Sequence, residues 1–378
     1  MGEAKIVKAL ILPINSIPMP SFSSLSSCMQ CGTCVASCSV RYDLNLRKII
    51  SAFLGKGSRF WSEEIWNCTT CRICQDRCPR GIPLTELIIK ARGDVVEEGK
   101  LPKEIRVMLE SIQKFSNPFG VGRSVRNEWM KGLELKFAGK DSFDYLFFAG
   151  CAVVDGRIME VARKAVELLK LAGVDFAVMK DEPCCGNDVK AVGEEGLFEL
   201  LMEENKKLFE KYGVERVIVM SPHCYNAFKN YYGLEVKHIS EILSEAVEEA
   251  KIRYSKVLEL KVTYHDPCYL GRYNGIFDAP RDLIKSIPGI EFVEMQRSRN
   301  LSICCGGGGG NIVRDMRHRP SLWRIDEAEL VAADVLAVSC PFCLMMLEDA
   351  AKVKKSEIEV MDIVELVYES VFGSKGDE

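Results

Sequence analysis

Eight cysteines near the start of the chain follow one spacing twice, Cys-x2-Cys-x2-Cys-x3-Cys. In runs of this kind, three thiols from one tight loop and a fourth thiol from the other run occupy the four corners of a cubane [4Fe-4S] cluster. The first expected ligand set is Cys28, Cys31, Cys34 and Cys78. The second expected ligand set is Cys68, Cys71, Cys74 and Cys38. The sequence therefore predicts two cubane clusters with interlocking ligand sets.

A pair of zinc sites is the alternative for these cysteines, because CxxC pairs also bind zinc. A zinc site does not require the third cysteine at CxxC spacing or the fourth cysteine that ends each run, so the spacing favours clusters over zinc. Pro79 follows the second run as expected, whereas Ser39 follows Cys38, a departure that leaves the thiol ligand in place. The spacer between the runs carries apolar residues at helical period, namely Leu46, Ile49, Ile50 and Phe53. We therefore expect an electron-carrying module surrounded by helices.

The total cysteine content excludes a disulfide framework. Seventeen cysteines among 378 residues are an odd number and too dilute for a secreted disulfide scaffold. They fall into groups, which in a cytosolic chain indicates metal or redox chemistry. The net charge of -4 gives no electrostatic footprint for nucleic acid, so we expect no nucleic-acid partner.

Membrane-spanning segments are not expected from the sequence. The longest strongly apolar stretches, such as residues 145–154, are far shorter than the ~20 residues that cross a bilayer. Residues 1–26 lack the long apolar centre of a cleavable signal. We therefore expect a cytoplasmic protein, with peripheral placement on the inner face of a membrane where a partner subunit supplies the anchor.

The part of the chain beyond residue 144 alternates short β-rich runs with longer helical runs. Strands are expected at 145–149, 174–178, 214–220, 262–265, 292–295 and 335–338. Helices are expected at 161–171, 197–212, 239–250, 278–287 and 363–372. Near-continuous apolar strands with helical crossovers predict α/β layers around a largely parallel sheet.

This second part is also an internal repeat, so the domain organisation can be predicted. Cys151, the Cys184-Cys185-Gly186 turn and Pro222-x-Cys224 recur 117 to 120 residues later as Cys268, Cys304-Cys305-Gly306 and Pro341-x-Cys343. We expect a helical ferredoxin-type domain at 1–120, a linker at 121–143, and two pseudo-symmetric α/β lobes at 144–255 and 256–378. The overall class is therefore α+β, with α/β lobes.

The two lobes differ in one cysteine. The second lobe contains Cys340, and the first lobe has Ser221 at the matching position. Several of these cysteines follow predicted strands, and ligands of α/β proteins collect at the carboxyl ends of strands. Sulfurs that are far apart in the sequence can therefore converge.

The complete pattern resembles the CCG-domain iron-sulfur oxidoreductases. It is most similar to the catalytic subunit of heterodisulfide reductase in its D-type form, which is a single polypeptide. The segments His265–Arg272 and Cys304–Gly310 closely match the sequence motifs of that family, and the resemblance extends from Cys28 to Cys343. It implies a non-cubane [4Fe-4S] cluster where a disulfide is reduced. By this resemblance, the ligands would be Cys268, Cys304, Cys305, Cys340 and Cys343.

The number of cysteines in the second lobe and the adjacent glycine run also favour a reactive metal centre. Five thiolates exceed the four corners of a cubane, and adjacent cysteines can each reach a different iron. The run from Gly306 to Gly310 removes side chains, so the N-H groups of Gly306 and Gly307 can approach the cluster and stabilise negative charge. The alternatives are a flexible loop for the glycine run and a strained vicinal disulfide for Cys304 and Cys305.

The first lobe and two histidines provide further candidate residues. Four cysteines of the first lobe suffice for zinc or a conventional cluster, and they are Cys151, Cys184, Cys185 and Cys224. His265 and His223 lie beside cysteines and are candidate proton donors to a departing thiolate, because the pKa of histidine is near neutrality. The alternative for each histidine is a packed, hydrogen-bonded side chain.

Six arginines between residues 297 and 324 form a candidate anion pocket. They are Arg297, Arg299, Arg314, Arg317, Arg319 and Arg324. Guanidinium forks bind sulfonate, phosphate and carboxylate groups, and the resemblance implies coenzyme M and coenzyme B, which carry them. A solvated face or a docking patch is the alternative.

Three function classes remain open. The first is disulfide reduction with single electrons from two [4Fe-4S] clusters, as in reduction of a CoM-S-S-CoB-type heterodisulfide. The second resembles the electron-transfer subunits of glycolate, lactate or glycerol-3-phosphate dehydrogenase complexes, which pass electrons from a flavoprotein toward quinone. The third is a zinc-stabilised interaction module. For the first class the resemblance implies a membrane cytochrome b-type partner.

Overall fold

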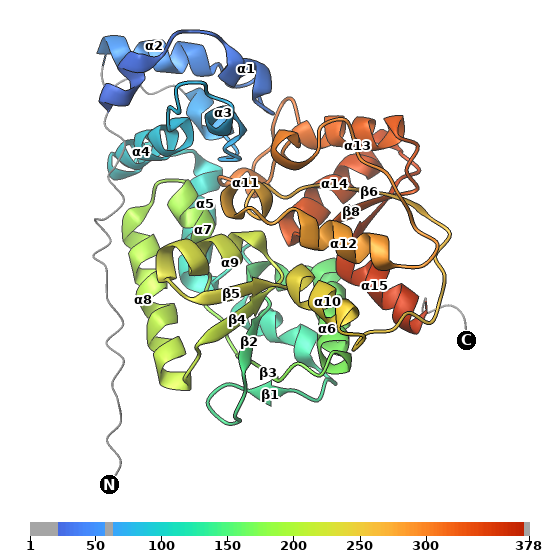
Figure 1. Cartoon of the computed structure of the whole chain (residues 1–378). Coiled ribbons are helices and arrows are strands. Elements are labelled where there is room, and N and C mark those ends of the chain that lie inside the picture. Colours follow the sequence, from blue (N-terminus) through green and yellow to red (C-terminus); the bar gives the residue numbers. More distant parts are fainter. Residues whose placement is uncertain (1–21, 57–62, 374–378) are drawn as a thin grey trace.

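The computed structural model describes residues 22–56 and 63–373. Within them, a helical N-terminal domain covers one end of two α/β lobes (Figure 1). Its elements are the 3-10 helices η2 (Phe22–Ser27) and η4 (Glu63–Asn67) and the α-helices α1 (Thr33–Ser37), α2 (Leu46–Lys56), α3 (Ile73–Asp76), α4 (Leu84–Glu97) and α5 (Lys103–Phe115). The helix expected in the spacer is therefore present as α2, and the domain is helical as expected.

Helix α5 shows how sequence period sets the packing of this domain. Its apolar residues recur at i, i+3, i+4 and i+7, so they lie on one face, and all four are buried: Ile105, Met108, Leu109 and Ile112. Ser116 ends the helix in the left-handed conformation and donates its N-H to the carbonyl of Ile112.

The first lobe is built on a five-stranded parallel sheet with the order β1-β3-β2-β4-β5. The strands are β1 (Lys136–Phe137), β2 (Tyr145–Phe148), β3 (Phe176–Val178), β4 (Arg216–Val219) and β5 (Glu235–His238). The connections contain η6 (Cys151–Val154), α6 (Gly156–Leu171), α7 (Asn187–Ala191), α8 (Glu195–Tyr212), α9 (Pro222–Ala227), the π-helical turn η7 (Phe228–Tyr232) and α10 (Ile239–Glu248).

The second lobe repeats this topology on a four-stranded parallel sheet with the order β7-β6-β8-β9. The strands are β6 (Lys261–Tyr264), β7 (Glu291–Phe292), β8 (Val335–Val338) and β9 (Glu359–Asp362). The other elements are α11 (Gly271–Asn274), α12 (Asp278–Ser286), η8 (Arg299–Leu301), η9 (Asn311–Val313), α13 (Pro320–Leu330), α14 (Pro341–Lys354) and α15 (Ile363–Phe372). The order β3-β2-β4-β5 in the first lobe matches it strand for strand. The predicted parallel α/β repeat is confirmed.

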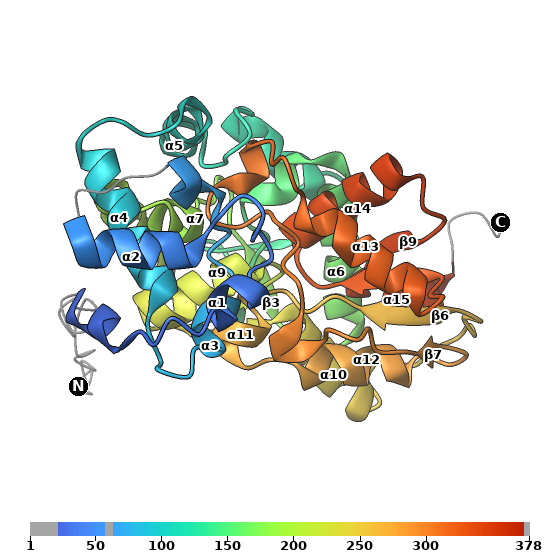
Figure 2. The same cartoon turned by 90° about the horizontal axis from the view of Figure 1, so that it is seen from above.

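The two lobes pack through contacts that a twofold axis would exchange. Helix α10 of the first lobe contacts α12 of the second, and α15 of the second lobe contacts α6 of the first. Figure 2 shows this interface from above. Glu365 on α15 is buried and pairs with Arg157 and Lys164 on α6. The lobes therefore share one continuous core.

Several elements differ from the sequence prediction. Strands β5 and β9 and helices α13 and α14 were not predicted, and β7 ends at Phe292, near the start of the strand expected at 292–295. Segment 121–143, expected to be a linker, instead contains the 3-10 helix η5 (Arg123–Met130), which buries Trp129, and supplies β1 to the first sheet. Trp129 packs edge-on against Phe147 in the core, which fixes this segment to the first lobe.

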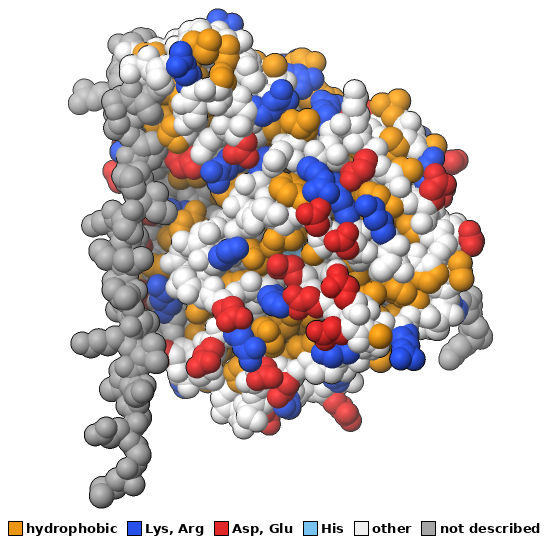
Figure 3. Space-filling view, in the orientation of Figure 1, with side chains coloured by type: hydrophobic (Ala, Val, Ile, Leu, Met, Phe, Trp, Pro, Cys, Tyr) orange, Lys and Arg blue, Asp and Glu red, His pale blue; other side chains and the backbone are white. Residues whose placement is uncertain are grey.

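The described residues contain no helix long and apolar enough to cross a membrane. Basic and acidic side chains are interspersed over the face seen in Figure 3.

Candidate iron-sulfur and thiol site

The N-terminal domain brings its eight cysteines together in the two sets expected from their spacing. One cavity is lined by Cys28, Cys31, Cys34 and Cys78, and Cys31 is exposed at its edge. The other set is buried beneath it, and its sulfurs interact with one another: Cys38, Cys68, Cys71 and Cys74. We call them the outer set and the inner set.

The two loops that carry these sets have the same backbone conformation. Gln30 and Gly32 in the first loop, and Thr70 and Arg72 in the second, all have positive φ. Three of these four residues are not glycine, so the loops hold an uncommon conformation. The N-H of Thr70 donates to the sulfur of Cys68 at 3.4 Å. Four converging thiols with backbone N-H donors fit an iron-sulfur cluster.

The second lobe brings its five cysteines into one buried chain of sulfurs. Contacts run from Cys268 to Cys304 and Cys305, and on to Cys343 and Cys340. The sulfurs of Cys343 and Cys305 are 3.3 Å apart. All five are free thiols, so the vicinal disulfide considered for Cys304 and Cys305 is not formed here.

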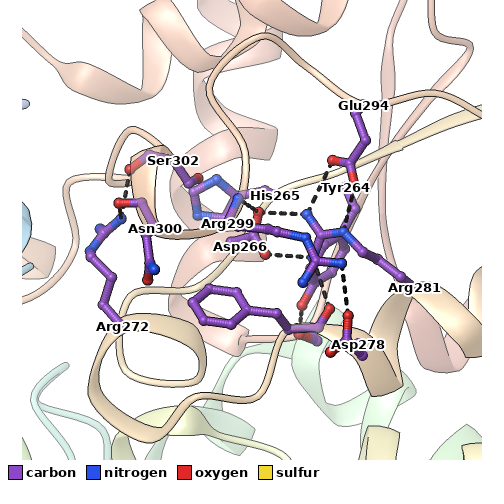
Figure 4. Close-up of polar contacts among 12 residues, drawn as sticks. Tyr264, His265, Asp266, Arg272, Asp278, Arg281, Glu294, Arg299, Asn300 and Ser302 are labelled. Atoms are coloured by element: carbon purple, nitrogen blue, oxygen red, sulfur yellow. Dashed lines mark hydrogen bonds and ion pairs between the residues drawn. The ribbon is translucent and has the colours of Figure 1, made fainter.

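Strand ends and helix starts position these sulfurs. Cys340 is the N-cap of α14, which places Cys343 in the first turn of that helix. Cys268 follows β6, where Asp266 anchors the loop by accepting hydrogen bonds from Arg281 at 2.7 and 2.9 Å and from the N-H of Arg299 at 2.7 Å (Figure 4). The sulfurs converge at the carboxyl ends of β6 and β8, as parallel-sheet topology predicts.

Hydrogen bonds lower the pKa of three of these cysteines, Cys304, Cys305 and Cys340. Hydrogen bonds with neighbouring thiols and burial raise the pKa of the other two, Cys268 and Cys343. Hydrogen bonds from Cys304 and Cys343 lower the pKa of Cys305 well below its ordinary value. Burial opposes ionisation of Cys340, but hydrogen bonds from Cys343 and His223 outweigh burial and lower its pKa to about 5. Five converging thiols, three of which have a lowered pKa, are a donor set suited to iron.

The glycine run beside these sulfurs has two distinct tasks. Gly306 donates its N-H to the sulfur of Cys304 at 3.3 Å, and the N-H of Gly307 donates to Cys305. Farther along, a Cβ on Gly308 would lie 2.6 Å from the carbonyl oxygen of Thr69. Gly308 and Gly309 are therefore needed for close packing against the loop of the inner set, a role that the sequence alone did not indicate.

The inner set and the second lobe are in direct contact. The side chain of Cys71 hydrogen-bonds with Cys304. The N-H of Cys304 donates to the hydroxyl of Ser39 at 3.0 Å, and Tyr269 and Thr70 share a hydrogen bond of 2.8 Å. The sequence distance between these partners is large, so spacing gave no sign of this contact.

His265 is buried beside the second-lobe sulfurs. A nitrogen of its ring lies within 4.8 Å of the sulfurs of Cys305 and Cys343. Its Nδ1 accepts a hydrogen bond from Nε of Arg324 at 3.2 Å, which assigns the ring proton to Nε2. Burial and the charge of Arg324 hold the pKa of His265 well below its usual value. The neutral form of His265 is therefore favoured, and its role as a proton donor stays a prediction.

His223 is held differently, although it belongs to the first lobe. Its Nδ1 is 2.7 Å from Asp188, and its ring packs against Tyr269 and Phe342 of the second lobe. Burial lowers the pKa of His223, but Asp188 and Cys340 outweigh burial and raise it well above its usual value. Sequence reasoning missed Asp188, because only its place three residues after Cys185 could have pointed to it.

The first lobe also gathers its four cysteines. Hydrogen bonds connect Cys151 to Cys184, Cys184 to Cys185, and Cys185 to Cys224. Two buried charged residues lie beside them. Glu182 accepts the N-H groups of Ala149 and Gly150 and pairs with Arg126 at 3.2 Å. The four converging thiols fit a metal ion or a cluster.

The six arginines between 297 and 324 do not converge on one pocket. Arg297 and Arg324 pair with Glu327, Arg299 pairs with Asp278, and Arg319 pairs with Asp349. The main contact of Arg314 is the carbonyl of Trp66. Five of the six are therefore already paired within the protein, and Arg297 and Arg324 share one carboxylate, which disfavours a shared anion pocket.

Comparison with known families identifies both parts of the chain. The 4Fe-4S dicluster domain matches residues 24–82, and the cysteine-rich domain CCG matches residues 145–229 and 262–348. In solved structures, a hypothetical protein from Helicobacter pylori shares the fold, with a TM-score of 0.55 and 9% identity over 87% of this chain and 67% of that chain.

Curated relatives come from bacteria and archaea. The probable iron-sulfur-binding oxidoreductase FadF of Bacillus subtilis is 39% identical over 84% of this chain and 48% of its own length. The EtfAB:quinone oxidoreductase of Syntrophomonas wolfei is 36% identical over 82% of this chain and 47% of its own length. This chain thus spans about half the length of these two relatives.

A third relative is matched over most of its own length. The D subunit of the dihydromethanophenazine:CoB-CoM heterodisulfide reductase of Methanosarcina mazei is 31% identical over 82% of this chain and 79% of its own length. The chain belongs to the family of CCG-domain iron-sulfur oxidoreductases, which includes FadF and the D subunit of heterodisulfide reductase.

Proposed function

We propose that this protein reduces a disulfide at the five cysteines of the second lobe, with single electrons that arrive through [4Fe-4S] clusters on the outer and inner sets. The contact between Cys71 of the inner set and Cys304 of the second lobe carries this proposal. An electron on the inner set is then adjacent to the second-lobe sulfurs. A heterodisulfide of the CoM-S-S-CoB type is the proposed substrate, in keeping with the Methanosarcina relative.

The reaction converts one disulfide, two electrons and two protons into two thiols. The S-S bond breaks, and each sulfur gains one electron and one proton in total. Because electrons arrive singly, one sulfur must be held between the two steps. A non-cubane [4Fe-4S] cluster on Cys268, Cys304, Cys305, Cys340 and Cys343 would supply an iron for that sulfur.

The protein's own residues surround the place where this sulfur would be held. A ring nitrogen of His265 lies within 4.8 Å of the sulfurs of Cys305 and Cys343, and His223 donates a hydrogen bond to Cys340. The N-H groups of Gly306 and Gly307 donate to the adjacent cysteines. Together these donors stabilise negative charge on sulfur, as disulfide cleavage requires.

Low-temperature EPR of the anaerobically purified, oxidised protein tests the proposal. Oxidised cubane clusters are EPR-silent, so we expect a new signal only after addition of coenzyme M or coenzyme B thiol. Silence with both thiols, despite a full iron complement, would contradict disulfide reduction at this site.

A second candidate function is electron relay between a flavoprotein and a quinone. The 39% and 36% identity to FadF and the EtfAB:quinone oxidoreductase favours it, as does the exposed edge of the outer set at Cys31. Its redox partners would be a flavoprotein and a membrane subunit such as a cytochrome b. Reduction of the cubane clusters by a co-purifying flavoprotein, together with EPR silence toward thiols, would support this function over the first.

We also propose that the first lobe holds a metal centre on Cys151, Cys184, Cys185 and Cys224. Their hydrogen-bonded arrangement supports it. Iron and zinc analysis of the purified protein and of a Cys184→Ser variant tests this directly. The variant should lose one metal centre per chain, and unchanged iron and zinc contents would contradict the proposal.

A further inference from the structure

Arg272 on α11 is buried where the second lobe meets the inner set. Its Nε donates to the carbonyl of Cys71 at 2.7 Å, and its Nη1 donates to the carbonyl of Ser302 at 2.8 Å. Figure 4 shows the guanidinium directed toward Ser302 and Asn300. The side chain of Arg272 thus connects the loop that carries Cys71 of the inner set with the segment that leads to Cys304 of the second lobe.

The remaining nitrogen of Arg272 is the unusual feature. Its Nη2 is buried and has no hydrogen-bond partner among the described residues. A buried donor without a partner is destabilising, and more so when the group is charged. A buried polar group without a partner calls for an explanation, and a redox role is one.

The charges around Arg272 indicate that task. Its electrostatic neighbours include the sulfurs of Cys71, Cys268 and Cys304, which belong to both sites. A single desolvated cation therefore acts on two sets of thiolates. In a buried environment its attraction for added negative charge is stronger than in water.

Arg92 provides the contrast, because it is an equally buried arginine beside the inner set. Its three nitrogens donate to backbone carbonyls of Ile65, Cys68, Ala191 and Gly309. Arg92 therefore holds loops together, and all of its donor atoms are engaged. Arg272 has an unengaged donor and faces sulfurs of two sites.

We propose that Arg272 is an electrostatic positioning residue that raises the reduction potential of the inner-set cluster and of the second-lobe centre together. Each reduction adds one negative charge, and the guanidinium stabilises it at either site. An electron that passes from the inner set to the second lobe then stays close to the same cation. The second-lobe part rests on the proposed function, whereas the inner-set part requires only the dicluster domain.

Redox titration followed by EPR tests this role in the intact, cluster-loaded protein. A Cys31→Ser variant first assigns the signal of the outer set. In Arg272→Gln we expect the equilibrium constant for reduction of the inner cluster to fall about tenfold. This corresponds to a reduction potential lower by about 59 mV for a one-electron couple. In Arg272→Lys, which keeps the charge, we expect most of the wild-type potential. The outer cluster is the internal control, and its reduction potential should not change.

Arg297→Gln is the matched control variant, because it removes a charge from the same lobe at a half-exposed position paired with Glu327. It should leave both cubane potentials unchanged. Equal shifts of the inner and outer clusters, no shift in Arg272→Gln, or a Lys variant that behaves like Gln would each overturn the proposal. If Arg272→Gln does not load its clusters, the Arg272→Lys variant decides. A tenfold fall in its equilibrium constant for reduction of the inner cluster would overturn the proposal, and a change below twofold would support the proposal. These readouts need no disulfide, so they stand apart from the EPR test with thiols.

Discussion

The side chain of His223, in the first lobe, forms a hydrogen bond with Cys340, in the second lobe. Asp188 fixes the opposite side of the imidazole at 2.7 Å. The first lobe has Ser221 where the second has Cys340, and it contributes a histidine to the second-lobe site two residues later. The two lobes are thus unequal halves of one site.

Replacement of His223 by Gln should slow disulfide reduction by roughly 10- to 100-fold. A hydrogen bond to a charged group contributes about 1.5–3 kcal/mol, and Gln keeps a donor but loses the positive charge. The measurement is the steady-state rate with a reduced dye as electron donor. His318→Gln is the control, because His318 is half-exposed and pairs with Asp43. Equal rates in the His223 variant and wild type would contradict this role.

Replacement of Cys305 by Ala should abolish disulfide reduction and leave both cubane clusters reducible. Cys305 contacts Cys304 and Cys343 at the centre of the run of sulfurs, whereas the inner set meets that run at Cys304. Dithionite reduction followed by EPR checks the cubanes, and turnover checks the site. Cys185→Ala changes the matching position of the first lobe and should retain turnover. Retained turnover in Cys305→Ala would disprove the site assignment.

Replacement of Gly308 by Ala should destabilise the junction between the second lobe and the inner set. The new Cβ would lie 2.6 Å from the carbonyl oxygen of Thr69, so one of the two loops has to move. Overpacking of this kind costs about 1–3 kcal/mol. Thermal bleaching of the cluster absorbance should shift to lower temperature. Gly122→Ala, where a Cβ meets nothing within 4 Å, should behave as wild type.

Asp362 should make the protein less stable as the pH rises from about 4 to 8. Burial raises the pKa of this carboxyl to about 8 from an ordinary 3.8. The folded protein therefore binds the proton more tightly than the unfolded polypeptide, so the free energy of unfolding falls as pH rises through this window.

Asp362→Asn tests this dependence. Asparagine retains an oxygen that can accept the N-H of Val364 at the N-cap of α15, and it removes the buried charge. The variant should unfold at higher temperature than wild type at pH 8 and match it near pH 4. A wild-type melting temperature that rises from pH 4 to pH 8, with no gain for the variant at pH 8, would contradict the prediction.

The cysteine positions and the strand-helix alternation were readable from the sequence, because both depend on short spacing. The runs at Cys28–Cys38 and Cys68–Cys78 predict ligand sets from local loop geometry, and parallel α/β lobes follow from apolar strands with helical crossovers. Strand β5 escaped prediction because its sequence, Glu235–His238, is mostly polar, with alternate residues facing solvent.

Tertiary structure alone decided how these parts meet. Cys71 contacts Cys304, Arg272 reaches the carbonyl of Cys71, and His223 of one lobe bonds to Cys340 of the other. Local spacing determines which thiols share a loop, because a turn of a few residues has few conformations. Contacts between residues more than a hundred positions apart depend on how sheets and helices pack. Packing also decided that the glycine run fits against the inner set and that the arginines disperse.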